Sequence, residues 1–153
     1  MSVALVLRGD DLAPFAAIHA QCFPDAWSEI ALDQLLATQG TFLLGHATGF
    51  VLARVAAGEA EILTLAVAPR ARRRGTATAL VEAAAAHAYG LGATEVFLEV
   101  AADNLPARTL YGRLGFAEAG LRKGYYSAGR DTPADALILR KALSPLGKSP
   151  SPR

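Results

Sequence analysis

Short apolar runs alternate with longer helical patterns along the whole chain. Runs rich in β-branched and aromatic residues predict strands at 3–8, 42–47, 50–56, 59–67, 94–100, 116–122 and 134–140. Apolar residues at helical spacing predict a helix to about Cys22 that Asp10 or Asp11 can cap, a second that starts at Ser28, a long one at 75–91 and a short one at 104–114. The expected order is therefore β-α-α-β-β-β-α-β-α-β-β.

Turn signals indicate how these elements connect. Thr48-Gly49 and Ala57-Gly58 separate successive strands as hairpin turns, whereas the two later helices read as crossovers between strands. This combination predicts the α/β class, with one domain built on a mixed, largely antiparallel sheet that is flanked by helices. We expect residues 1–143 to form that domain and the Pro/Ser-rich residues 144–153 to be a disordered C-terminal tail.

Composition and charge narrow the function classes. The chain has 153 residues, of which 52% are hydrophobic, so it can bury one sizeable core. A net charge of +1 argues against direct binding of nucleic acid. The single cysteine excludes an internal disulfide, and His19, His46 and His87 lack metal-ligand spacing, so no metal is expected. No apolar run approaches the ~20 residues of a membrane helix, and the first residues do not read as a signal peptide, so we expect no membrane partner and a cytoplasmic location by default.

A basic turn between the strand at 59–67 and the helix at 75–91 is the most informative segment. It carries Arg-x-x-Gly-x-Ala at Arg72, Gly75 and Ala77. Backbone N–H groups at a helix N-terminus attract anions, and arginines beside them add charge for phosphate oxygens. The turn is thus a candidate pyrophosphate cradle, although its spacing fits neither common nucleotide-binding loop. The alternative is an ordinary helix N-terminus beside a solvated arginine cluster.

A second group of candidate residues follows about thirty residues later. Glu99 lies within an otherwise apolar strand, where a carboxylate is unusual unless it is paired or functional; the alternative is the solvated side of an edge strand. Asn104 can cap the next helix, and Tyr111 lies on that helix, either with a functional hydroxyl or as a packing aromatic.

Both segments resemble the GNAT superfamily of N-acetyltransferases. The basic turn is similar to its acyl-CoA loop, Gln/Arg-x-x-Gly-x-Gly/Ala, and the second segment is similar to its pattern Asn-x-x-Ala-x-x-Leu-Tyr-x-x-x-Gly-Phe. The resemblance implies a GNAT-type domain that uses acetyl-CoA. It also implies a base at Glu99, a proton donor to the CoA thiolate at Tyr111, and a pantetheine contact at Asn104. The implied cofactor contacts on the strand and the turn are Leu65, Ala66, Val67, Arg72, Arg73, Arg74, Gly75, Thr76, Ala77 and Thr78.

A finer resemblance connects the chain to the ribosomal-protein-alanine N-acetyltransferase (RimI) family. The matching segments are Phe23-Pro24 with Trp27-Ser28-Glu29, Leu98-Glu99-Val100, Arg122-x-x-Tyr125-Tyr126 and Asp135-Ala136-x-x-Leu139. They imply an acceptor that is the N-terminal peptide of a small-subunit ribosomal protein, with Trp27, Tyr125 and Tyr126 as candidate walls of its groove. The alternative for these aromatics is core packing.

The sequence also departs from this family in two places. Many members have Arg where this chain has Ala101, and the segment between Tyr126 and Asp135 differs from theirs. Both places lie near the expected acceptor site. A small-molecule amine or another protein N-terminus therefore stays open as the acceptor, as does a CoA-binding module without catalysis.

Overall fold

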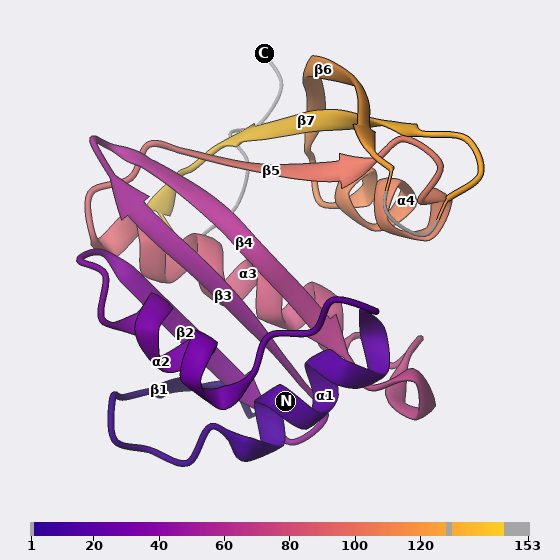
Figure 1. Cartoon of the computed structure of the whole chain (residues 1–153). Coiled ribbons are helices and arrows are strands. Elements are labelled where there is room, and N and C mark those ends of the chain that lie inside the picture. Colours follow the sequence, from indigo (N-terminus) through magenta and orange to yellow (C-terminus); the bar gives the residue numbers. More distant parts are fainter. Residues whose placement is uncertain (1, 128–129, 146–153) are drawn as a thin grey trace.

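The computed structural model describes residues 2–127 and 130–145. Within these residues one sheet of seven strands has the order β1-β2-β3-β4-β5-β7-β6 (Figure 1). The strands are β1 (Ala4–Val6), β2 (Thr41–His46), β3 (Gly49–Ala56), β4 (Glu59–Val67), β5 (Glu95–Ala101), β6 (Ala117–Tyr126) and β7 (Ala134–Ala142). The helices are α1 (Ala13–Cys22), α2 (Glu29–Leu36), α3 (Thr76–Gly90) and α4 (Leu105–Arg113), with a short 3₁₀ helix η1 (Pro69–Ala71).

The predicted order of strands and helices and the mixed, largely antiparallel sheet are confirmed. Neighbouring strands pair antiparallel except β4 and β5, which are parallel. A parallel pair needs a crossover, and α3 supplies it between the end of β4 and the start of β5.

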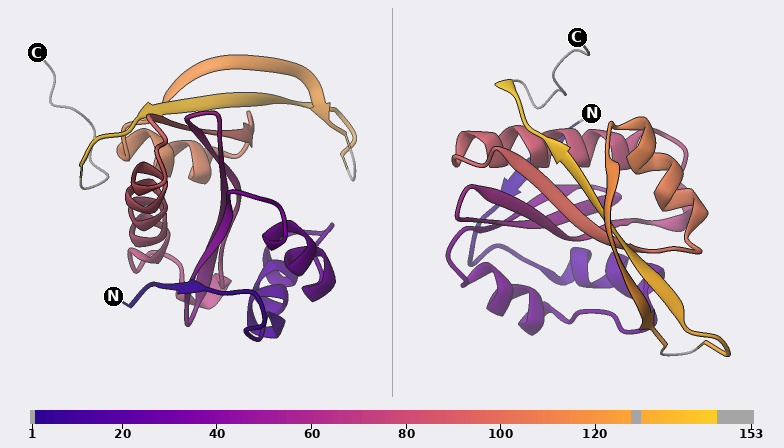
Figure 2. Two further views of the ribbon diagram at one scale, coloured as in Figure 1. Left: turned by 90° about the vertical axis from the view of Figure 1, so that its left-hand side faces the viewer. Right: turned by 90° about the horizontal axis from the view of Figure 1, so that it is seen from above.

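Helices cover both faces of the sheet. Figure 2 shows α1 and α2 on one face, α3 and α4 on the other, and the β6–β7 hairpin crossing over the top of both layers. The side-chain alternation of β3 divides the core between the layers: Phe50 and Leu52 pack with Leu32 on the α1/α2 side, whereas Val51 packs with Leu80 on the α3 side. Phe50, Leu52, Leu32, Val51 and Leu80 are all fully buried.

The parallel pair of strands is short. β4 and β5 pair only from Glu59 with Glu95 to Glu61 with Phe97. Just beyond this point β4 contains a bulge, because Leu52 pairs with Thr64 and Ala53 with Ile62, which leaves Leu63 as an extra residue. Bulges bend a strand and change its twist. From Ile62 in β4 and from Leu98 in β5 onward, the two strands therefore do not pair with each other. We call this opening between them the wedge.

Small residues let α3 and the central strands approach closely. Ala84, Ala85 and Ala88 of α3 are buried against the sheet. Gly49 begins β3 where a Cβ atom would lie 2.7 Å from the carbonyl oxygen of Ala66 and 3.2 Å from Leu80. Because Gly49 has no side chain, β3 lies close against the end of β4, which forms one side of the wedge.

Several element ends differ from the expected ones, including the start of α1 and the end of β6. α1 begins only at Ala13 with Leu12 as its cap residue, and the Asp11 carboxylate accepts a hydrogen bond from the Ala13 N–H at 3.0 Å. The Asp10 carboxylate instead accepts from the Leu7 N–H, so neither aspartate is the cap residue. β6 runs to Tyr126 rather than to position 122, because pairing with β7 resumes after an irregular stretch. The predicted tail lies outside the described residues except for Ser144 and Pro145.

We expect Gly49→Ala to lower the free energy of unfolding by roughly 1–3 kcal/mol, the usual range for overpacking, because the backbone of β4 cannot yield easily. Urea unfolding measures this change. Gly90→Ala is the matched control, since a Cβ atom at Gly90 meets nothing within 4 Å. Equal stability of the two variants would show that β3 and β4 can separate without strain.

Candidate active site

The wedge exposes the backbone of β4 at the three predicted contact residues Leu65, Ala66 and Val67. Each pairs with β3 on one edge, whereas the β5-facing edge has no strand partner. Ala66 and Val67 are buried, and Leu65 packs partly against the core on the α3 side. Backbone N–H and C=O groups in such a setting need partners. An extended ligand that carries amide groups can supply them.

The basic turn leads from the end of β4 into α3. After η1 the chain takes positive φ angles at Arg73 (65°) and Gly75 (82°), and α3 begins at Thr76. The N–H groups of the first helical turn, which includes Thr76, Ala77 and Thr78, have no acceptor within the helix. A Cβ atom added at Gly75 would meet nothing within 4 Å, so the space above this backbone is open. The geometry is that of an anion cradle.

The three arginines of the turn have different environments. The Arg72 side chain folds back: its Nε donates to the Val67 carbonyl oxygen at 3.2 Å and its Nη2 lies 3.5 Å from the Cys22 Sγ. The Cys22 thiol donates to the same carbonyl at 3.3 Å. Arg73 and Arg74 are exposed and form no ion pair with the described residues. Arg72 thus stabilises the end of β4, while the other two cations are available to a ligand.

Glu99 lies in the part of β5 that has separated from β4. Its neighbours Leu98 and Val100 are buried on the α3 side, so the alternation of the strand directs Glu99 toward the α1/α2 side. Its side chain is 23% exposed, and its carboxylate pairs with the Arg122 guanidinium at 3.4 Å, across the intervening strand β7. β5 is an inner strand of the sheet, but at Glu99 its edge toward β4 is open, so the partial exposure of this side chain comes from the wedge.

The two tyrosines at the end of β6 lie near this carboxylate. Burial raises the pKa of Tyr126, and the Glu99 carboxylate and Tyr125 raise it further. Arg130 and Arg122 act in the opposite direction and lower this pKa. The rings of Tyr125 and Tyr126 meet edge to face with centroids 5.2 Å apart. Tyr125 is exposed and Tyr126 is half-buried. The pair therefore offers aromatic surface beside Glu99.

Trp27 lies in the loop between α1 and α2, on the side of the sheet toward which Glu99 points. Its ring stacks on the buried His19 with centroids 5.0 Å apart. The side chain is half-buried and packs against the core of that layer, while part of its surface stays accessible.

Tyr111 lies on α4, across the sheet from Glu99. It is 6% exposed, belongs to the core on the α3 side, and meets Phe116 edge to face with ring centroids 5.3 Å apart. Burial raises the pKa of its phenol well above the usual range, so the hydroxyl keeps its proton at neutral pH. Asn104 caps α4, because its Oδ1 accepts from the Ala107 N–H at 3.2 Å.

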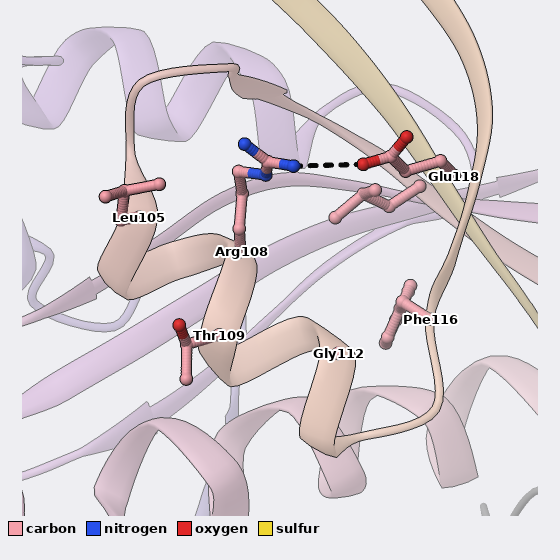
Figure 3. A pocket seen from close by; sticks show the side chains of 7 residues that line it. Leu105, Arg108, Thr109, Gly112, Phe116 and Glu118 are labelled. Atoms are coloured by element: carbon pink, nitrogen blue, oxygen red, sulfur yellow. Dashed lines mark hydrogen bonds and ion pairs between the residues drawn. The ribbon is translucent and has the colours of Figure 1, made fainter.

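A separate cavity of about 370 Å³ lies between α4 and the β6–β7 hairpin (Figure 3). Its lining includes Leu105, Thr109 and Gly112 of the helix, with the ion pair between Arg108 and Glu118 at 3.1 Å across it. None of the candidate residues lines this cavity, although Tyr111 contacts Phe116 of its lining. The wedge, with the open edge of β4 at Leu65 to Val67 and Glu99 on β5, is therefore the candidate site.

Three residues near the site escaped the sequence analysis as candidates. Arg122 was noted only within a motif, and its pairing with Glu99 depends on the strand order β5-β7-β6. Arg130 forms an ion pair with Asp103 and lies over the Tyr126 ring at 6.0 Å. His19 gave no signal beyond being a histidine in a helix. Within residues 2–127 and 130–145, no group of three or more His, Cys, Asp or Glu residues could hold a metal ion.

Comparison with known proteins agrees with this geometry. A family model described as the Acetyltransferase (GNAT) family matches residues 10–116. The chain belongs to this family. It is an acetyl-CoA-dependent N-acetyltransferase of the RimI group.

The relatives include the [ribosomal protein bS18]-alanine N-acetyltransferase of Escherichia coli, which is 35% identical over 140 residues, 84% of this chain and 90% of that protein. The crystal structure of the ribosomal-protein-S18-alanine N-acetyltransferase from Escherichia coli superposes with a TM-score of 0.82 and 28% identity, covering 94% of each chain. Arabidopsis thaliana NAA60 in complex with acetyl-CoA has the same fold, with a TM-score of 0.75 and 22% identity over 92% of this chain and 98% of that one. No helix among the described residues is long and apolar enough to cross a membrane.

The raised pKa of Tyr111 makes stability fall in alkaline solution. A phenol in the unfolded chain ionises near pH 10, so above that pH only the unfolded state releases the proton, and stability drops until the folded pKa is reached. We expect the free energy of unfolding of Tyr111→Phe to fall less than that of the wild type between about pH 9 and pH 11. Urea unfolding at both pH values measures the difference, with Tyr89→Phe as the control for loss of an exposed phenol. Identical pH dependence in the wild type and Tyr111→Phe would contradict the burial of a neutral phenol.

Proposed function

We propose that this enzyme transfers the acetyl group of acetyl-CoA to the N-terminal α-amine of a protein, and that the acceptor is the N-terminal alanine of a small-subunit ribosomal protein. The observation that carries the proposal is the wedge between β4 and β5, with Glu99 on one face of the sheet and Tyr111 on the other. The name of the Escherichia coli relative supports the choice of acceptor. A ribosomal acceptor would place the reaction in the cytoplasm.

The open edge of β4 and the turn before α3 are proposed to hold the cofactor together. Amides of the pantetheine arm would pair with the backbone of Leu65 to Val67, as an added strand does at a sheet edge. The pyrophosphate would lie on the N–H groups that follow Gly75, near Arg73 and Arg74. Asn104 caps α4, and because this residue is exposed, it would also contact the pantetheine.

The two faces of the wedge suit a direct attack on the thioester. The amine nitrogen bonds to the acetyl carbon, and the carbon–sulfur bond of acetyl-CoA breaks. The proton of the amine passes to the Glu99 carboxylate, directly or through water, because an ammonium group has no lone pair. The neutral phenol of Tyr111 gives its proton to the departing thiolate, and the phenolate takes up, through water, the second proton that the nitrogen loses as the amide forms. Base and acid approach from opposite sides, so neither blocks the other.

The proposed acceptor groove lies on the α1/α2 side of the sheet. Figure 2 shows β6 and β7 extending over this side. Trp27 would form one wall, and Tyr125 with Tyr126 the other, beside Glu99. A peptide in such a groove gains binding energy from residues beyond the amine, which a small amine cannot do.

The cofactor assignment predicts that Gly75→Glu weakens acetyl-CoA binding by at least about tenfold, because the side chain would occupy the cradle and repel the phosphates. Calorimetry measures the affinity. Gly58→Glu is the matched control: it also has a positive φ angle (78°) and open space around its Cβ position, but it lies in the β3–β4 turn. If both variants bind acetyl-CoA as the wild type does, the pyrophosphate lies elsewhere.

The base assignment predicts a pH-dependent loss in Glu99→Gln. At and below neutral pH the α-amine, with a pKa of about 7.7–8.0, is mostly protonated and needs the base, so turnover should fall roughly 10²–10⁴-fold there and less in alkaline solution. A pH–rate profile measures this, with Glu118→Gln of the surface ion pair as the control. A loss of equal size at every pH would mean that Glu99 orients the acceptor instead.

The acceptor assignment is tested by comparing kcat/KM values. The hexapeptide from the N-terminus of the ribosomal protein should exceed alanine amide and a panel of small amines, and a bulky first residue should reduce the rate because a pocket for a methyl group excludes it. Small amines that react faster than every peptide would refute the proposed acceptor, while the acetyl transfer itself would stand.

A further inference from the structure

A buried histidine joins the loop of the proposed acceptor groove to the strand of the cofactor site. We infer that His19 is a positioning residue for the peptide acceptor, because both of its ring nitrogens hold the α1–α2 loop against β4. This inference deepens the proposed function and rests on the location of the acceptor groove given there.

Both ring nitrogens of His19 have partners from different elements. The backbone N–H of Trp27 donates to Nδ1 at 3.0 Å, and Nε2 lies 3.1 Å from the Oγ1 of Thr64. Because Nδ1 accepts, the ring proton is on Nε2, which therefore donates to the threonine hydroxyl. Burial lowers the pKa of His19, in keeping with a neutral ring whose Nδ1 is free to accept.

The partner on β4 lies at the point where the strand changes direction. Thr64 follows the extra residue of the bulge and precedes Leu65, the first of the proposed pantetheine contacts. Leu63 and Thr64 both contact the α1/α2 layer, as the bulge allows. His19 therefore binds the side chain of a residue in the same stretch of β4 whose backbone would hold the cofactor.

The partner on the other side is the loop that carries Trp27. The imidazole of His19 is stacked between Trp27, with centroids 5.0 Å apart and planes at 9°, and Phe23, with centroids 4.5 Å apart. The ring is 3% exposed, so it cannot itself reach an acceptor in the groove. It acts through Trp27, whose position it fixes by one hydrogen bond and one stacking contact.

A set of three variants isolates this role. His19→Phe keeps a stacking ring and removes both hydrogen bonds, whereas His19→Asn places an amide oxygen near the Nδ1 position and can again accept from Trp27. His87→Phe is the matched control, since His87 is another histidine that packs on an aromatic ring (Phe42, centroids 4.4 Å apart) but belongs to α3. Circular dichroism confirms that each variant is folded.

We expect His19→Phe to raise KM for the hexapeptide by about tenfold, the effect of losing the hydrogen bond that holds Trp27. Changes in kcat and in acetyl-CoA affinity should be smaller. His19→Asn should recover most of the loss, and His87→Phe should match the wild type. Trp27 is the only tryptophan of the chain, so acrylamide quenching of its fluorescence reports the loop directly, and quenching should increase in His19→Phe.

Two results would overturn the inference. Unchanged quenching and unchanged peptide KM in His19→Phe would reduce His19 to a packing residue. If acetyl-CoA affinity weakens by the same factor as the peptide KM rises, His19 supports the sheet generally. If the wild-type enzyme prefers a small amine, the proposed acceptor is wrong, but Trp27 quenching still decides whether His19 holds the loop.

Discussion

The short parallel pairing between β4 and β5 is the constraint on which the rest of the site depends. Only the residues from Glu59 to Glu61 pair with β5 before the strands part, and the bulge at Leu63 bends β4 away. Had the ladder continued, the backbone of Leu65 to Val67 would be saturated with hydrogen bonds. Since a parting pair of strands leaves polar backbone groups without partners in each other, the opening is stable only where water or a ligand pairs with those groups.

The surrounding layers support the wedge in different ways. On the α3 side, alanines and Gly49 bring helix and strands into close contact, so the end of β4 leads directly into the turn before α3. Arg72 and Cys22 bind the last carbonyl of that strand, at Val67. On the α1/α2 side, the support is polar and aromatic instead, through His19. One layer thus fixes the cofactor strand, and the other connects it to the acceptor loop.

Local sequence signals were enough for the order of elements, the fold class and the capping role of Asn104, because each depends on residues a few positions apart. They also led to the correct family. The sequence could not place Arg122 beside Glu99, since that contact requires the strand order across β7. The hydrogen bonds of His19 to residues 8 and 45 positions away were equally out of reach. The predicted cap of α1 was wrong. The Asp10 carboxylate accepts from the Leu7 N–H, which precedes it, and the cap residue is Leu12, one position after Asp11.

A crystal structure with a bisubstrate analogue, in which CoA is joined to the α-nitrogen of the ribosomal N-terminal peptide, tests the central claim most directly. The account predicts that the pantetheine lies along β4 at Leu65 to Val67, that the pyrophosphate lies on the N-terminus of α3, and that the peptide leaves on the α1/α2 side between Trp27 and Tyr126. Glu99 should then lie within hydrogen-bonding distance of the α-nitrogen, directly or through one water. A peptide that leaves on the α4 side, or a pantetheine outside the wedge, would contradict the account.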